Sequence, residues 1–364
     1  MNYTPGPSVQ KRQQLQFPWE SPPENGHWQT VAEGVVWLRM PLPFGLDHIN
    51  LYLLQHDDGW VVVDTGLGTE QSREVWERVF REVMGGAPVK AVIATHFHHD
   101  HAGCLGWLAR RFKCPVYMTH GEYHALFISP PEEDEPNWEF SQFYARSGVS
   151  EERQQDFLRV VRAGSFEQDV PTSYNRLIHE QVLRIGGRDW QIVIGSGHSP
   201  EHACLYCHED RLFISGDQVL PGITSSVCVA VTEPEANPLK NWLDSIERLR
   251  GISDEVLVLP AHERPFYGLH CRLHQLTEHH HKHLDAMLGQ LDDPKTADQM
   301  MAFIFPRAQS PFDALLANGE TLAHLNFLMS EKRITRRLEG ECFLYQRAGD
   351  AGEPSARTQV THIS

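Results

Sequence analysis

Residues 95–103 read THFHHDHAG and follow a short apolar run. Four of these nine residues are histidines and one is an aspartate. An imidazole nitrogen and a carboxylate oxygen both suit zinc and similar divalent ions. His96 and His98 are two residues apart, so in extended backbone they leave the chain on the same side, and Asp100 and His101 follow directly. The stretch therefore predicts a strand that ends in a turn and presents its side chains to two neighbouring metal ions.

Bulk composition limits the classes of protein to which this chain can belong. Its 364 residues suit one large domain plus a smaller one, and its formal charge of −16 disfavours a broad surface for nucleic acid. The seven cysteines form no disulfide framework, which fits a reducing cytoplasm, and Cys204 and Cys207 read as two residues of an apolar strand. No apolar run approaches the roughly 20 residues of a membrane span. We therefore expect a cytoplasmic protein with no membrane partner.

Strand and helix patterns alternate along most of the chain. An Asp58-Gly59 turn between apolar runs predicts a hairpin, and residues 69–84 read as an amphipathic helix. Further strands and helices alternate to about residue 265, which predicts an α/β sandwich. Residues 121–178 break this rhythm with aromatic-rich helices and predict an inserted cap, for which a substrate-covering role and a purely surface role are both open.

The C-terminal third reads as mostly helical. A long helix is expected from Pro265 to about Leu291, and its HHHKH run at residues 279–283 is interpreted as a solvated face, because successive helix residues point in different directions. Residues 296–347 predict two or three short helices and a final strand. The tail at residues 348–364 is expected to be disordered.

Three further metal-binding candidates each follow an apolar strand-like run. Asp217 is placed to bridge two ions through its two oxygens, and each ion keeps an open position for water, as in catalytic sites. Two ions about 3.5–4 Å apart can share a hydroxide. The predicted ligands are His96, His98 and His198 for the first ion, Asp100, His101 and His262 for the second, and Asp217 for both.

The motifs VVVDTG, THFHHDH, GSGHSPEH, SGDQ and PAHE together resemble the metallo-β-lactamase superfamily over about residues 30–270. The resemblance implies a four-layer αβ/βα sandwich with a dinuclear metal site at one edge. Asp64 resembles the aspartate of the first motif, which supports a ligand by hydrogen bonds. His99 stands at the non-ligand position, so it is expected to pack or to face solvent. His202 is expected to support a ligand or to be structural.

The predicted domain boundaries follow from these patterns and from the resemblance. The C-terminal part looks like the small, mostly helical, winged-helix-like domain of the lactamase-beta-2-like group. Its basic cluster comprises Lys332, Arg333, Arg336 and Arg337. Because the chain as a whole has a net negative charge, the cluster is interpreted as a solvated helix end rather than an RNA contact. The expected units are an N-terminal extension (1–28), a catalytic domain (29–285) with its cap insertion (121–178), the C-terminal domain (286–347) and the tail (348–364).

The leading hypothesis is a dinuclear metal-dependent hydrolase of the glyoxalase II-like branch, because the bridging Asp217 points away from antibiotic hydrolysis. A metal-bound hydroxide would attack a thioester, ester or lactone carbonyl, and Asp100 would be the catalytic residue that orients the nucleophile and moves a proton. The expected cofactors are two divalent ions, with zinc as the default and iron or manganese as alternatives. The cap side chains predicted to roof the acyl group of a small-molecule substrate are Trp138, Phe140, Phe143 and Tyr144.

Three alternatives stay open at this stage. The first is a metal-dependent phosphodiesterase or endoribonuclease on single-stranded RNA, whose binding would weaken steeply with salt. The second, a minor one, is a mononuclear iron enzyme similar to persulfide dioxygenases, which share these motifs. The third is a non-catalytic metal-binding module, which the complete ligand set disfavours. The acyl group, the leaving group and the oligomeric state, with a homodimer as one option, are not determined by the sequence.

Overall fold

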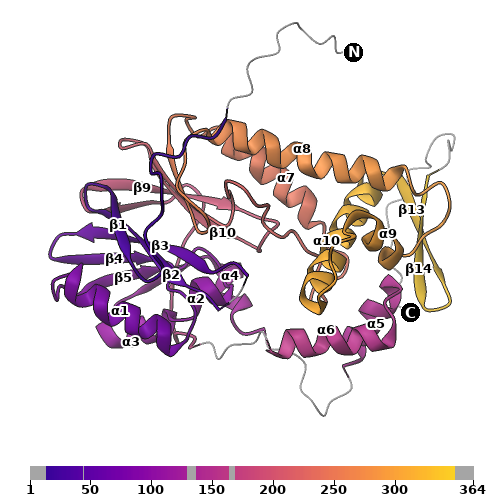
Figure 1. The fold of residues 1–364 in the computed structure, drawn as a ribbon, viewed down its shortest axis with the longest axis horizontal. Helices are drawn as coiled ribbons and strands as arrows, with labels where there is room; N and C mark the ends of the chain where they lie inside the picture. Colours follow the sequence, from indigo (N-terminus) through magenta and orange to yellow (C-terminus); the bar gives the residue numbers. More distant parts are fainter. Residues whose placement is uncertain (1–13, 44, 129–136, 164–168, 349–364) are drawn as a thin grey trace, which may run out of the picture.

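The computed structural model describes residues 14–43, 45–128, 137–163 and 169–348. The first 13 residues of the predicted extension and residues 349–364 of the predicted tail lie outside these ranges. Two mixed sheets are stacked face to face, with helices on both outer faces (Figure 1). Within the described ranges, no helix is both long enough and apolar enough to cross a membrane.

The first sheet is built from the N-terminal half of the chain and is antiparallel at one end and parallel at the other. The predicted hairpin is present, with a two-residue turn at Asp57-Asp58. Its strands, in spatial order, are β1 (Trp28–Ala32), β2 (Val35–Pro41), β3 (His48–His56), β4 (Gly59–Val63), β5 (Val89–Ile93), β6 (Val116–Met118) and β7 (Asn175–Arg176).

The second sheet follows later in the chain. It is antiparallel except for the parallel pair β11 and β12, whose carboxyl ends therefore meet at the same edge. Its strands, in spatial order, are β12 (Leu257–Pro260), β11 (Leu212–Gly216), β10 (His202–Cys207), β9 (Arg188–Gly195) and β8 (Val182–Ile185). Cys204 and Cys207 are buried residues of β10, as the apolar pattern predicts.

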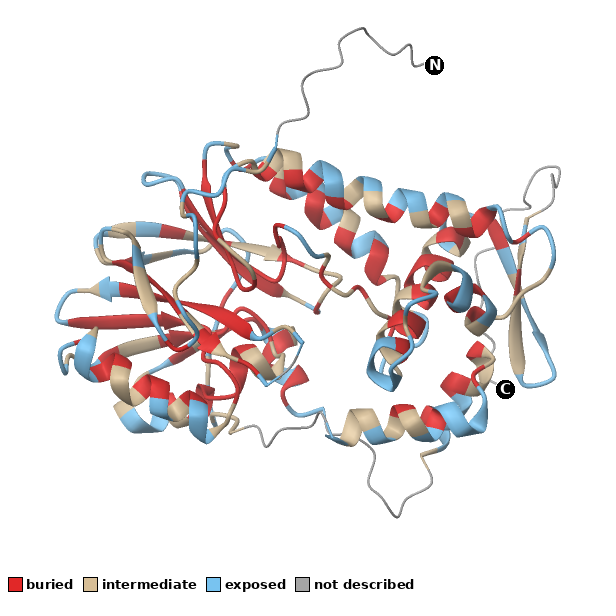
Figure 2. Ribbon diagram, viewed as in Figure 1, coloured by how far each residue is buried: buried red, intermediate tan, exposed pale blue. Residues whose placement is uncertain are grey.

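The alternating side chains of the strands form a core between the two sheets, for example Trp37 and Val63 against Trp190 and Leu205. Helices α1 (Glu70–Glu82) and α3 (Leu105–Phe112) cover the outer face of the first sheet. Helices α7 (Pro238–Leu249) and α8 (Leu269–Leu288) cover the second. The predicted four-layer αβ/βα sandwich is confirmed, and Figure 2 shows buried residues running through both sheets.

The C-terminal part differs from the prediction of short helices and one final strand. It contains α9 (Ala297–Ile304), the 20-residue α10 (Pro311–Ser330) and a hairpin of β13 (Ile334–Glu339) and β14 (Cys342–Arg347). Gly319 weakens the helical pattern within α10, but a Cβ at this position would lie 2.8 Å from the Cβ of Cys228. A close approach between α10 and a distant loop, which the local sequence does not reveal, therefore explains the glycine.

The predicted cap forms the short α4 (His120–Ala125), followed by α5 (Trp138–Ser147) and α6 (Glu151–Ala163). Helices α5 and α6 pack on the C-terminal elements: α6 contacts α10 and α5 contacts β14. Phe157 of α6 is completely buried in the same core as Leu325 of α10. The insertion and the C-terminal part thus share one hydrophobic core.

Candidate metal centre

The residues predicted to bind metal come from both sheets and meet at one edge of the sandwich. Each follows a strand or lies in the short helix α2 (His99–Ala102), because loops at strand ends present their side chains at the sheet edge. Two groups of side chains have their donor atoms within 4.8 Å of one another: His96, His98, His198 and Asp217 in one, and Asp100, His101 and His262 in the other.

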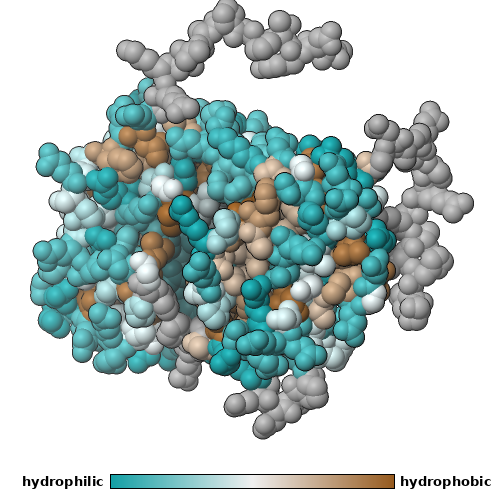
Figure 3. Space-filling view, turned by 45° about the vertical axis from the view of Figure 1, so that its right-hand side comes forward, coloured by the Kyte–Doolittle hydropathy of each residue, from teal (hydrophilic) through white to brown (hydrophobic). Residues whose placement is uncertain are grey.

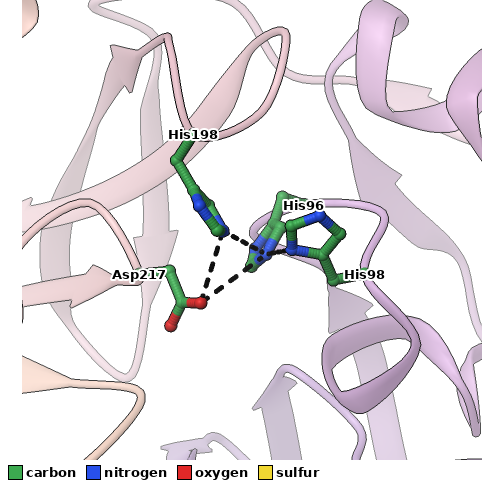
Figure 4. A group of neighbouring side chains, drawn as sticks. All are labelled: His96, His98, His198 and Asp217. Carbon is green, nitrogen blue, oxygen red and sulfur yellow. Dashed lines mark hydrogen bonds and ion pairs between the residues drawn. The ribbon is translucent and has the colours of Figure 1, made fainter. Parts of the chain in front are cut away.

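The first group is shown in Figure 4, with His96 between its neighbours. His96 Nε2 lies 2.8 Å from His98 Nδ1 and 3.3 Å from His198 Nε2. Asp217 Oδ2 is 3.3 Å from His198 Nε2 and 4.0 Å from His96 Nε2. Three imidazole nitrogens and one carboxylate oxygen thus converge on one point.

The second group lies on the other side of the Asp217 carboxylate. Asp217 Oδ1 is 3.6 Å from His101 Nε2 and 3.4 Å from His262 Nε2. Asp100 Oδ2 faces the same two nitrogens, at 3.7 and 3.5 Å. The two oxygens of Asp217 therefore face different groups, which is the arrangement of a carboxylate that bridges two ions.

The donor atoms of these groups fit divalent ions. His101 Nε2 and Asp217 Oδ1 are buried and have no hydrogen-bond partner among the described residues. Burying such atoms without a partner costs about 1–3 kcal/mol each. Imidazole nitrogen and carboxylate oxygen are ligands for zinc, iron and manganese. A metal ion in the second group would satisfy both orphaned atoms.

The charges of the second group also favour a cation. Burial alone would raise the pKa of Asp217, but the charges of His262 and His101 hold it well below its usual range. Burial alone would lower the pKa of His101, but Asp100, Asp64 and Asp217 raise it well above its usual range. Three carboxylates around one imidazole make an excess of negative charge, which a proton or a divalent ion balances.

Hydrogen bonds on the far side of the rings set which nitrogen points inward. His198 Nδ1 donates to the backbone oxygen of Ser226 (2.8 Å), and His262 Nδ1 donates to that of His48 (2.9 Å). With the proton on Nδ1, the lone pair of Nε2 faces the group, as in known metal-binding histidines.

Asp64 orients a third histidine. Its Oδ2 accepts hydrogen bonds from His101 Nδ1 and Thr95 Oγ1, both at 2.8 Å, and its Oδ1 accepts one from the Thr95 amide at 2.7 Å. Asp64 adopts a left-handed backbone conformation (φ 61°), which is uncommon for a residue with a side chain. It therefore supports His101 from behind and belongs to neither group of donor atoms.

His202 and His99 also occupy the expected kinds of position. His202 is fully buried, and its Nε2 accepts a hydrogen bond from the backbone amide of Asp217 at 3.1 Å. It thereby holds the turn that presents Asp217. His99 is partly exposed and belongs to neither group.

Glu122 is a supporting residue that the sequence analysis missed. Its Oε1 accepts hydrogen bonds from Ser199 Oγ and the Glu201 amide, both at 2.6 Å, and its Oε2 accepts one from the Phe97 amide at 3.1 Å. Burial raises the pKa of Glu122 to about 7, whereas its three donors favour the ionised form. Only its place directly after β6, in the run THGE, could have suggested this role.

The loop that carries His262 has a second missed support, on the opposite sheet. Asn50 of β3 donates to the backbone oxygens of Pro260 (2.9 Å) and Glu263 (3.1 Å). The side chain of Trp37 in turn donates to Asn50 Oδ1 at 2.7 Å. The first sheet therefore positions a ligand candidate that follows the second sheet.

The predicted acyl roof is not assembled as expected. Phe140, Phe143 and Tyr144 are buried in the core that α5 shares with α10, because their own helix packs its aromatic face inward. Trp138, with 63% of its surface exposed, lies instead at a hollow between α5, α10 and the C-terminal hairpin. Of the four predicted side chains, three contribute to packing.

Comparisons with known proteins find family models and relatives that match most of the chain. A family model described as the metallo-beta-lactamase superfamily matches residues 44–262, and one described as the metallo-beta-lactamase-like C-terminal domain matches residues 284–348. Probable metallo-hydrolase YqjP of Bacillus subtilis is 24% identical over 326 residues, which cover 87% of this chain and 98% of that protein. Human acyl-coenzyme A thioesterase MBLAC2 is 25% identical over 248 residues, covering 65% of this chain and 81% of that protein.

Two solved structures are similar over most of the chain. A beta-lactamase domain protein from Burkholderia ambifaria has a TM-score of 0.83 and 36% identity, and the match covers 92% of this chain and 98% of that one. A metallo-beta-lactamase family protein from Thermus thermophilus has a TM-score of 0.73 and 28% identity, covering 88% of this chain and all of that one (100%).

Proposed function

The chain belongs to the metallo-β-lactamase superfamily, and from this premise we propose that it is a dinuclear metal-dependent hydrolase that cleaves thioesters, esters or lactones. The observation that carries the proposal is the position of Asp217. Its two oxygens face two separate groups of donor atoms, so one carboxylate can hold both ions at a fixed separation. Zinc is the default metal for this set of nitrogen and oxygen ligands.

The ligand candidates fall into two sets, one for each ion. His96, His98 and His198 would hold one ion, and Asp100, His101 and His262 the other, with Asp217 shared. When bound, two such ions lower the pKa of a shared water and polarise a carbonyl oxygen. The hydrogen bond from His101 to Asp64 fixes the orientation of the His101 ring, and the hydrogen bond from Ser199 to Glu122 fixes the loop that carries His198.

Asp100 is the proposed catalytic residue. Its Oδ2 faces His101 and His262, which leaves Oδ1 to receive a proton from the nucleophile and pass it to the leaving group. The Asp100 side chain is 23% exposed, against 10% for Asp217 and none for His101. Its position at the solvent side of the group suits a carboxylate that meets a substrate.

A thioester is the proposed substrate class, with an apolar acyl group. The similarity to MBLAC2, described as an acyl-coenzyme A thioesterase, supports this class. Exposed apolar side chains occur next to elements that support the candidate centre: Phe127 and Ile128 follow α4, which carries Glu122, and the Ile223 amide donates to Glu263, the residue after His262. These side chains replace the buried aromatic residues as candidates to contact an acyl chain.

No observation favours the RNA alternative. Arg336 pairs with Glu235 at 3.0 Å, Arg337 with Glu339 at 3.2 Å and Arg333 with Asp285 at 3.6 Å. Three members of the basic cluster thus already face carboxylates, which would compete with phosphate groups.

The proposal is tested by thiol release from a panel of acyl-coenzyme A and acyl-glutathione thioesters, with metal-loaded protein. Turnover should fall by about 100-fold or more in Asp100→Ala. The exposed Asp244→Ala, on α7, should keep wild-type turnover. No turnover of any thioester by the metal-loaded wild type would refute the thioester class and move the search to lactones and oxygen esters.

A further inference from the structure

We propose that the protein binds one more divalent transition-metal ion, between α8 and α10, through Glu320 and the histidines that surround it. This site is separate from the candidate metal centre and involves no residue of it. Two sets of donor atoms within 4.8 Å of one another share the Glu320 carboxylate: His279 and His283 complete one set, and His280 and His324 complete the other.

The helices supply these side chains at the spacing that helical metal sites need. His279 and His283 are four residues apart on α8, and Glu320 and His324 are four residues apart on α10. Residues at this spacing lie on the same face of a helix. Helices α8 and α10 contact each other, so the two faces meet (Figure 1).

The separation of the nitrogens matches two ligands of one ion. Zinc–nitrogen bonds of about 2.0–2.1 Å in a tetrahedral site place two ligand nitrogens about 3.3 Å apart. His280 Nδ1 lies 3.2 Å from His324 Nε2. The corresponding pair in the candidate metal centre, His96 Nε2 and His198 Nε2, is 3.3 Å apart.

The orientation and protonation of the rings also suit a ligand role. His324 Nδ1 donates to the backbone oxygen of Glu320 at 2.7 Å, which directs the lone pair of Nε2 toward His280. Burial lowers the pKa of His280 to about 2 and that of His324 to about 4. Both imidazoles are therefore neutral, the form that binds metal ions.

The cluster contains buried polar atoms that nothing in the described chain satisfies. His283 Nδ1 is buried and has no hydrogen-bond partner among the described residues, so it is free to bind an ion; the Nε2 of the completely buried His280 also has none, but it lies on the far side of the ring from the proposed ligand atom Nδ1. Among the same residues, no ion pair reaches Glu320. A solvated face, as the HHHKH run suggests, holds only for His281 and Lys282, which are exposed.

Charge balance argues for one ion rather than two. The cluster has a single carboxylate to offset the charge of a dication, and a second buried dication would find no further anion there. Glu320 and the paired His280 and His324 supply three ligands, and a water molecule can complete a tetrahedral site. Such a set suits zinc, cobalt, nickel or copper ions.

The position of the site suggests a structural role. Arg272 of α8 donates to the backbone oxygen of Leu220 (2.5 Å), and the Val229 amide donates to the backbone oxygen of Gly319 in α10 (3.0 Å). Both helices thus hold the loop that follows Asp217. An ion bound by both α8 and α10 would hold these two hydrogen bonds in fixed positions relative to each other.

The first test is metal content. Wild-type protein and variants are dialysed against the same trace of free Zn²⁺, and bound zinc is measured by inductively coupled plasma mass spectrometry. Glu320→Gln and His324→Gln should each hold one equivalent less than the wild type. The exposed His281→Ala, one residue from His280, should hold as much as the wild type. Equal zinc content in the wild type and Glu320→Gln would overturn the proposal.

The second test keeps the proposal falsifiable if a variant folds poorly. Without metal, Glu320→Gln replaces a half-buried carboxylate that has no ion-pair partner among the described residues by a neutral group of the same shape, so its melting temperature should equal or exceed that of the metal-free wild type. Added Zn²⁺ should raise the melting temperature of the wild type by more than that of the variant. An equal gain in both proteins would contradict a site at Glu320, since the candidate metal centre is intact in each.

Discussion

Asp64 is the residue whose replacement tests the support of His101 most directly. Asparagine keeps the shape but places an amide nitrogen where Thr95 and His101 donate to two carboxylate oxygens. We expect Asp64→Asn to lower metal affinity by about 10–100-fold. Competition with a coloured chelator measures this, and the exposed Asp57→Asn is the control. Equal affinity in both variants would show that His101 keeps its position without Asp64.

Replacing Glu122 tests, in a similar way, how the loops of the first group of donor atoms are held. All three of its partners are donors, so Glu122→Gln turns one acceptor into a clashing donor in a buried place. The loops that carry His98 and His198 should then separate, and zinc retention should fall by about 10-fold or more. The exposed Glu139→Gln should retain zinc like the wild type. Unchanged retention in Glu122→Gln would mean that the two loops are held by other contacts.

At the scale of elements, the prediction concerns how strongly α6 packs against the C-terminal helices. Phe157 is completely buried against the C-terminal helices, so Phe157→Ala should lower the free energy of unfolding by about 3–5 kcal/mol. Zinc content should not change, because the side chain belongs to neither metal cluster. Denaturant unfolding measures the loss, with the exposed Arg159→Ala as control. A loss below about 1 kcal/mol would be too small for a docked helix.

Element boundaries were predicted well where periodicity is strong. The amphipathic pattern at residues 69–84 corresponds to α1 at Glu70–Glu82, with Thr69 as its N-cap. The hairpin at Asp57-Asp58 is present for a similarly local reason, since turn residues separate two apolar runs. The C-terminal strand pair was harder to predict, because β13 carries charged residues and its pattern reads as a helix end.

At the scale of the whole molecule, metal binding should be linked to stability. A ligand that binds only the folded chain stabilises it by about 4 kcal/mol per site when its free concentration is about 1,000 times the dissociation constant. Both proposed metal sites join elements distant in the sequence, so a chelator should lower the melting temperature by several degrees. Thermal unfolding with and without chelator, followed by zinc addition, measures the effect. An unchanged melting temperature would indicate that the folded chain binds no metal tightly.

Hydrophobic surface is distributed unevenly over the molecule. In Figure 3, hydrophobic surface gathers near the middle of the face shown, with hydrophilic surface around it. The net charge of −16 lies mostly on the hydrophilic remainder, since few charged side chains are fully buried. The hydrophobic surface on this face is thus bordered by a charged, hydrophilic one.

The sequence patterns alone predict an α/β sandwich and the set of metal-binding candidates, and the resemblance to the metallo-β-lactamase superfamily adds the four-layer arrangement. The candidates can be recognised from short-range features, because they lie in segments that follow apolar strands, and segments that end neighbouring strands meet at one edge of the sheet. For this reason the sequence predicts one site for His96 and His262, although they are far apart in the chain.

The remaining features depend on contacts between elements that are distant in the sequence. The burial of His280 depends on α10 lying against α8, and Glu122 acts on loops that reach it only when both sheets are in place. The aromatic residues of the insertion pack inward because the C-terminal helices offer them an apolar surface. Contacts between residues far apart in sequence arise from packing, and the local pattern of polar and apolar residues does not encode which partner a side chain will meet.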